Sequence, residues 1–226
     1  PEMMGDGGRL LVNTSEVYYT GYSLGGNRGP SLLGLSPDVN RGALWVGGAA
    51  FSHQIERCTQ YDQFDDLMES VIGYPSQLDR AVVISLIQSL WDATDTNTWT
   101  TLSEGWGDKV QPFEMIYIGS IGDLQISNIS TSRALRNADA SILSSSSIHP
   151  YGLPITEGGE GTTGNVGVYF DGGFSHAPEQ NLLGQEPHPA HNWVAGVEAA
   201  HRMAFEYIFN GYVVDRCDGS CIYDAA

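Results

Sequence analysis

Basic side chains are scarce in this sequence. Lys and Arg total 10 against 27 Asp and Glu, which gives a formal net charge of −17, and Lys109 is the only lysine. Such an excess of negative charge repels phosphate backbones and anionic lipid surfaces. We therefore expect no nucleic-acid partner.

Long apolar runs are also missing. No stretch approaches the ~20 apolar residues that a membrane span requires, so no span is expected. The first residues, PEMMGDGGRL, lack the basic and apolar regions of a signal peptide. Any export signal is therefore expected upstream, in a precursor.

The composition excludes several classes of protein. Of the 226 residues, 41% are hydrophobic and 16% are charged. A chain of this kind can bury a sizeable core, which rules out wholesale disorder, a collagen repeat and a coiled coil. A globular protein of one domain, or most of one, remains.

Cysteine is rare, with three residues in the chain. Cys217 and Cys221 bracket a flexible Asp-Gly-Ser, a spacing at which two thiols can close a small ring. A disulfide there implies an oxidising compartment, so the protein is expected to be secreted, periplasmic or on the cell surface. The alternatives are two free thiols or, less favoured without a second Cys pair, a zinc site. Cys58 is either a buried free thiol or bonded to another chain.

Short apolar runs bounded by glycines predict strands of a mostly parallel sheet. A strand at 17–20, a helix ending near Ser36 and a strand at 43–46 form one strand, helix, strand unit, which implies parallel pairing. Further strands are predicted at 113–118 and 166–170, and the last helix at 193–209. The expected parts are 1–49, a helical insertion at 50–112 that covers one end of the sheet, and 113–226.

Within the insertion, a helix is predicted to begin at Ser76. Leucine and valine then recur every four residues, at Leu78, Val82, Leu86 and Leu90. This spacing is typical of an amphipathic helix. Three tryptophans of the insertion, Trp91, Trp99 and Trp106, are candidates for shaping an apolar acyl pocket, although tryptophans in an insertion more often only pack there.

Gly21-Tyr22-Ser23-Leu24-Gly25 matches the G-x-S-x-G pattern of a nucleophile elbow, with a predicted strand before it and a helix after it. The glycines suit a strained turn that has close neighbours. The alternative is a plain glycine-rich turn. A serine hydroxyl is a weak nucleophile at neutral pH, so Ser23 requires a histidine base and a carboxylate that orients the histidine.

Two acids and two histidines compete for these roles. Asp123 follows a predicted strand and leaves room for one more strand before the histidine, so we prefer it to Asp171, which begins a turn or binds a cation. His191 directly precedes the last helix and is preferred as the base to His188, which lies between two prolines. His201 and His176 are weaker candidates. No metal site and no cofactor are expected.

These segments together resemble the α/β-hydrolase superfamily, in particular the C-terminal half of a secreted bacterial lipase- or esterase-like family. The resemblance rests on GYSLGG, ALWVGG, IYIGSIGDLQISN, HNWVAGVEAAHRMAFEYIFNG and CDGSC, and it spans nearly the whole chain. It implies a triad of Ser23, Asp123 and His191, with the Leu24 amide as one oxyanion-hole donor.

The same resemblance implies that part of the fold is missing. Only 22 residues precede Ser23, whereas an α/β-hydrolase places several strands before its elbow and takes its second oxyanion donor from among them. A companion chain or a longer precursor is therefore expected to supply the N-terminal half. The resulting hypotheses are a serine hydrolase of carboxylic esters and a non-catalytic hydrolase-like subunit with an acidic surface.

Overall fold

A computed structural model of the chain describes residues 15–176 and 189–224. Its centre is a six-stranded sheet with the strand order β1-β2-β3-β6-β4-β5, in which every neighbouring pair is parallel. The strands are β1 (Tyr19–Tyr22), β2 (Arg41–Trp45), β3 (Glu114–Ser120), β4 (Ser141–Leu143), β5 (Ile155–Thr156) and β6 (Val166–Phe170). The predicted α/β class, with a mostly parallel sheet, is confirmed.

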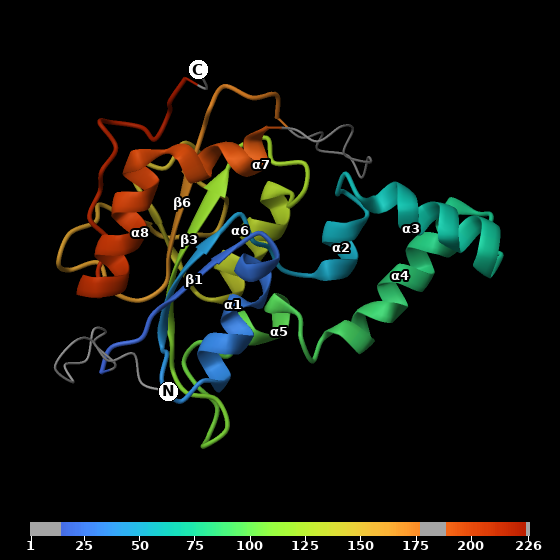
Figure 1. Cartoon of the computed structure of the whole chain (residues 1–226), viewed down its shortest axis with the longest axis horizontal. Coiled ribbons are helices and arrows are strands. Elements are labelled where there is room, and N and C mark those ends of the chain that lie inside the picture. The colour runs from blue at the N-terminus through green and yellow to red at the C-terminus, as the bar shows by residue number, and fades with distance from the viewer. Residues whose placement is uncertain (1–14, 177–188, 225–226) are drawn as a thin grey trace, which may run out of the picture.

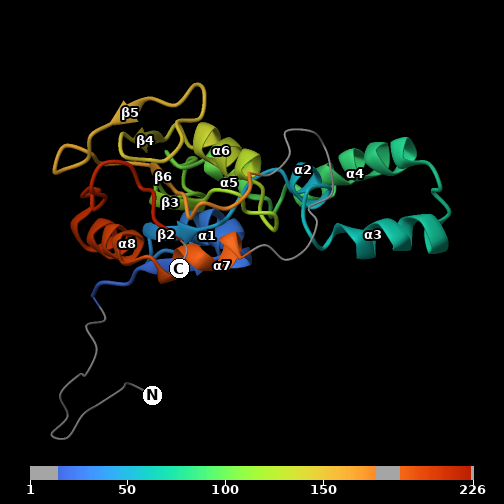
Figure 2. The ribbon, with the colours of Figure 1, turned by 90° about the horizontal axis from the view of Figure 1, so that it is seen from above.

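Helices cover both faces of the sheet, which explains why the central strands are apolar along their whole length. One face packs on α1 (Leu24–Leu35) and α6 (Asn128–Asn137), through Leu33 and Leu135. The other packs on α8 (Glu198–Asn210), through Met203 and Tyr207. Figure 2 shows α6 and α8 on opposite sides of the strands.

Helix α1 continues through Pro30, which lacks the amide that would bond the carbonyl of Gly26. The Tyr117 hydroxyl, from β3, donates to that Gly26 carbonyl at 3.1 Å. A side chain of the sheet therefore replaces the lost helical hydrogen bond, and the helix that follows the serine is preserved.

The insertion is helical, as predicted. It contains α2 (Phe51–Ile55), α3 (Tyr61–Leu67), the π-helical turn η1 (Met68–Ile72), α4 (Gln77–Trp91) and α5 (Thr96–Thr100). Ser76 caps α4 by accepting a hydrogen bond from the Asp79 amide at 3.4 Å. In Figure 1, α3 and α4 project sideways from the sheet.

The apolar row on α4 does not pack as an amphipathic pattern suggests. Its four residues face solvent with exposed fractions between 50% and 77%: Leu78, Val82, Leu86 and Leu90. The buried side of α4 carries Arg80 and Ile84 instead. Arg80 pairs there with Asp65 of α3 at 2.7 Å, so an ion pair as well as apolar packing joins the two helices.

The C-terminal helix is divided, which corrects the prediction of one helix over 193–209. The chain forms α7 (Ala190–Trp193), a 3-10 turn η2 (Val194–Gly196) and then α8. The interruption follows from Gly196, a weak helix former, and from Val197, whose backbone is extended. Gly211 ends α8 at φ 80°, as expected of a glycine stop.

The cysteines pair as the sequence indicated. Cys217 and Cys221 form a disulfide, with Cα atoms 5.1 Å apart, and Cys58 is a buried free thiol. Across residues 15–176 and 189–224, no helix is long and apolar enough to cross a membrane.

Candidate active site

Ser23 stands on a sharp turn between β1 and α1. Its backbone has φ 55° and ψ −113°, a conformation that a non-glycine residue adopts only under strain. The turn is tightly enclosed, because a Cβ at Gly21 would lie 2.4 Å from the Gly25 carbonyl oxygen and one at Gly26 would lie 2.6 Å from that of Trp45. This is the geometry of a nucleophile elbow.

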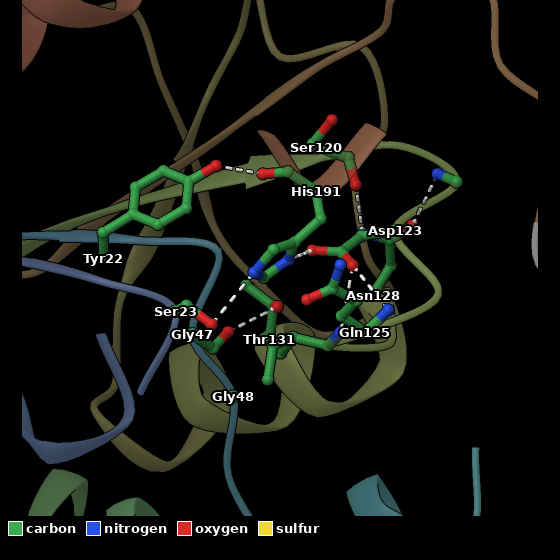
Figure 3. Close-up of polar contacts among 12 residues, drawn as sticks. Tyr22, Ser23, Gly47, Gly48, Ser120, Asp123, Gln125, Asn128, Thr131 and His191 are labelled. Carbon is green, nitrogen blue, oxygen red and sulfur yellow. Dashed lines mark hydrogen bonds and ion pairs between the residues drawn. The ribbon is translucent and has the colours of Figure 1, made fainter. Parts of the chain in front are cut away.

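A continuous hydrogen-bonded chain links Ser23, His191 and Asp123 (Figure 3). The His191 Nε2 atom lies 2.9 Å from Ser23 Oγ, and its Nδ1 atom lies 2.7 Å from Asp123 Oδ2. The histidine and the aspartate are 2% and 1% exposed. With Nδ1 protonated, the imidazole can accept the serine proton at Nε2 while the carboxylate holds the ring in place.

The loop after β3 fixes the carboxylate of Asp123. Its Oδ1 atom accepts hydrogen bonds from the amides of Gln125 at 2.8 Å and Ile126 at 3.0 Å, so Oδ2 is left to face the histidine. Asn128 closes the loop: it accepts from the Gly122 amide at 3.1 Å and donates to the Ser120 carbonyl at 2.6 Å. The side chains of Asp123 and Asn128 in the GDLQISN motif therefore hold this loop, whereas Gln125 contributes only its backbone N–H to the network.

His191 lies in the short helix α7, not in a loop as the sequence suggested. Tyr22 holds it from the other side, since its hydroxyl donates to the His191 backbone carbonyl and its ring meets the imidazole edge to face at 5.6 Å. Burial, with a smaller contribution from the charge of Asp123, raises the pKa of Tyr22 to about 12. The sequence analysis missed Tyr22. Its place as the second residue of the G-x-S-x-G motif does not indicate which distant backbone atom its hydroxyl contacts.

The rival residues lie elsewhere. The Asp171 carboxylate accepts from the Gly173 amide at 2.8 Å, which makes it the start of a turn. His201 packs against Trp45 and contacts the Ala195 carbonyl, and His176 is exposed. His188 lies outside the described residues.

The backbone around Ser23 offers one amide for an oxyanion. Leu24 is the first residue of α1, so its N–H has no carbonyl partner within its own helix. The Gly48 amide is nearby in the loop after β2, but it donates to Asn27 Oδ1 at 2.6 Å. The Leu24 amide thus stays the candidate donor, whereas the Gly48 amide is already engaged.

A buried carboxylate, Asp95, organises the insertion beside the site. Its Oδ1 atom accepts from the Ala50 amide at 3.0 Å, and its Oδ2 atom accepts from the Phe51 amide at 2.7 Å and from Gln88 Nε2 at 2.9 Å. Asp95 thereby anchors the start of α2. No local signal in the sequence indicates this role, because the Ala50 and Phe51 amides are 45 and 44 residues away.

The three tryptophans of the insertion separate. Trp91 packs on Phe51 and lines a small hollow beside Leu24 and Arg28. Trp99 packs near Gly34 of α1, and Trp106 is exposed with Lys109 over its ring. Only Trp91 is close to the elbow.

A metal ion would require several side chains of the described residues to offer ligand atoms close together. Their one grouping of potential ligands is Asp215, Cys217 and Cys221. Because the two cysteines are joined in a disulfide, they offer no thiolate to a metal ion.

Comparison with known proteins gave structural likenesses alone. No family model matches the chain, and no curated protein matches its sequence. A solved acylaminoacyl peptidase of Pyrococcus horikoshii has a TM-score of 0.46 at 13% identity, with 92% of this chain and 26% of that one covered. Acetyl xylan esterase 1 of Thermoanaerobacterium sp. JW/SL YS485 has a TM-score of 0.44 at 14% identity, with 76% and 44% covered. The chain thus spans less than half the length of either protein.

Proposed function

We propose that this chain carries the nucleophile, acid and base of a serine hydrolase that cleaves carboxylic esters. The observation that carries the proposal is the buried hydrogen-bonded series from Ser23 through His191 to Asp123 at a strained strand-to-helix turn. Each group has the partner that its role requires, and the order along the chain is serine, acid, histidine.

In this mechanism, Ser23 Oγ attacks the ester carbonyl carbon and its proton passes to His191 Nε2. Asp123 accepts from Nδ1 and stabilises the imidazolium that forms. The carbonyl oxygen becomes an oxyanion beside the Leu24 amide. The imidazolium then protonates the departing alcohol, which leaves an acyl group on Ser23. Water, activated by the neutral His191, releases the carboxylic acid and restores the serine.

Labelling with a fluorophosphonate probe tests the proposal, because such probes bond to an activated serine. We expect Ser23 to be labelled in the native protein, together with any partner it retains, and a short p-nitrophenyl ester to be hydrolysed. Ser23→Ala is expected to abolish both, while Ser31→Ala, in the helix α1 that follows Ser23, retains both. Absence of labelling in the folded native protein would instead favour a non-catalytic, hydrolase-like subunit with an acidic surface.

A companion segment forms part of the proposal. Among the described residues, β1 pairs on one side only, with β2. Large apolar side chains stand exposed beside it on both faces of the sheet, with Leu32 and Leu35 on α1 and Phe205 and Phe209 on α8. An unpaired edge between apolar patches favours pairing with a further strand. That strand would come from another chain or a longer precursor, which would also supply a second oxyanion donor.

Intact-mass and N-terminal analysis of the native protein test this part of the proposal. We expect additional polypeptide, either covalently upstream or in a stable complex. A folded, monomeric and active protein made of this polypeptide alone would refute it. The disulfide also supports a secreted, periplasmic or cell-surface location.

A further inference from the structure

A cavity of about 230 Å³ opens beside Ser23. It lies between the insertion and the loop that carries Asp123. Four of its apolar lining residues come from α2, α3 and the segment between them, and they are Phe51, Ile55, Cys58 and Phe64. The fifth, Ile126, comes from the loop after β3. The nucleophile itself forms part of the lining, so whatever fills the cavity lies next to the reacting carbonyl.

Among the described residues, no charged side chain lines this cavity, although the chain carries 27 acidic residues. The polar lining besides Ser23 consists of three neutral amides, Gln54, Gln60 and Gln125. Burial raises the pKa of the Cys58 thiol, which is therefore protonated and contributes an apolar surface. A charged group would lose its hydration here without gaining a counter-ion.

The hollow on the other side of α2 has a different character. It holds about 50 Å³, and Arg28 and Asp95 are among its lining residues. Phe51 and Gln54 line both spaces, so α2 separates them. Asp95 anchors the start of this helix and Trp91 packs on Phe51 at 4.9 Å, which together fix the dividing wall. Ser23 thus lines the larger, neutral space, while the smaller hollow with its charged lining residues lies on the other side of α2.

We propose that the larger cavity binds an uncharged, apolar arm of the ester, comparable in size to a phenyl ring or a chain of several methylene groups. This inference rests on the proposed function of Ser23. An apolar cavity of about 150 Å³ is enough to hold benzene, so the space beside Ser23 accommodates such an arm with room to spare. Acetate would leave most of it unfilled.

Two series of esters determine whether the apolar arm belongs to the acyl group or to the alcohol. The first keeps p-nitrophenol as the leaving group and changes the acyl group among acetate, hexanoate, benzoate and the charged hemisuccinate. The second keeps an acetyl group and lengthens the alcohol. We expect kcat/KM to rise at least tenfold from acetate to hexanoate or benzoate in the first series, or from methyl to hexyl in the second, since apolar groups gain from burial. The series that rises identifies the arm. The hemisuccinate is expected to be at least tenfold poorer than hexanoate.

Two variants test whether this cavity is responsible. Cys58→Phe fills it and should lower, at least fivefold, the ratio of kcat/KM between the long and the short ester of whichever series rises. Phe64→Ala opens its rim and should lower the same ratio about threefold. The matched control is Leu67→Ala, because Leu67 is on the same helix and is 46% exposed against 47% for Phe64, but does not line the cavity. The control should leave the ratio unchanged.

The outcomes separate the two proposals. If acetate esters are not hydrolysed and Ser23 is not labelled, the proposed function itself is wrong. If acetate is hydrolysed but both series are flat, or the hemisuccinate is preferred, the function stands and the cavity assignment is overturned. The assignment also fails if Leu67→Ala changes the ratio as much as Phe64→Ala. Should Cys58→Phe not fold, Phe64→Ala still decides, because Phe64 lies at the exposed rim.

Discussion

The hydroxyl of Tyr22 donates to the backbone carbonyl of His191, 169 residues further along the chain. Tyr22 directly precedes Ser23, so two consecutive residues hold the histidine at different points. The serine contacts Nε2 of the ring, and the tyrosine contacts the main chain and the ring edge. The position of the base relative to the nucleophile is thereby fixed through one short stretch of backbone.

Tyr22→Phe is expected to lower kcat for a short ester about tenfold with KM within twofold. The ring remains but the His191 carbonyl loses its donor, and small displacements of a catalytic group can cost up to about 100-fold. The loss of one hydrogen bond should also reduce the free energy of unfolding by about 1 kcal/mol. Steady-state kinetics and urea denaturation measure the two effects.

The control for this change is Tyr18→Phe. Tyr18 directly precedes β1, and its ring packs against Phe209 of α8. If both variants lose stability and only Tyr22→Phe loses kcat, Tyr22 is a positioning residue. Equal kcat in both variants would leave it with a structural role alone.

Asp123→Asn is expected to lower kcat by about 10⁴-fold. The Oδ1 atom should keep its bonds to the Gln125 and Ile126 amides, so the new amide group replaces Oδ2 and faces His191 Nδ1. Because that group donates a hydrogen bond, the imidazole proton moves to Nε2, which can no longer accept the proton of Ser23. Activity within tenfold of the parent would contradict this role. Asp171→Asn is the matched control and should remain active.

Local signals in the sequence predicted much of the site. The elbow at Ser23, the loop of Asp123 and the disulfide ring each lie within a few consecutive residues, where spacing alone restricts the geometry. The start of α4 was predictable for the same reason, because it depends on one local N-cap, Ser76. His191 was identified by its place along the chain, although it lies in a helix.

Features that depend on distant partners were not predictable. The carboxylate of Asp95 bonds to amides about 45 residues away, and nothing near it in sequence identifies them. Helix periodicity revealed the apolar row of α4 but not that this row faces solvent. The side that packs is set by the ion pair of Arg80 with Asp65, which the apolar pattern does not include.

Asp95→Asn is expected to reduce the free energy of unfolding by about 3 kcal/mol. One oxygen is lost, and the amide that replaces it faces the N–H groups of Phe51 and Gln88, which are donors themselves. Hydrogen bonds to charged groups contribute roughly 1.5–3 kcal/mol each. Urea denaturation gives the change, with the exposed Asp108→Asn as control. A loss no larger than that of the control would show that Asp95 does not anchor α2.

Stability is expected to fall steeply above pH 10. Burial raises the pKa of Tyr22 and Tyr61 from the ordinary value of 10.0 to about 12, and raises those of Tyr117 and Tyr207 still further. Below pH 10 both the folded and the unfolded chain keep these protons, so stability does not depend on them. Above pH 10 the unfolded chain loses them first and binds fewer protons. The free energy of unfolding then falls by up to about 1.4 kcal/mol per pH unit for each such tyrosine.

An alkaline titration followed by tyrosinate absorbance and far-ultraviolet circular dichroism measures this. The buried tyrosines should ionise only as the dichroism signal is lost. Complete ionisation near pH 10 with the dichroism retained would show that Tyr117 and Tyr207 are not held in a buried, neutral state.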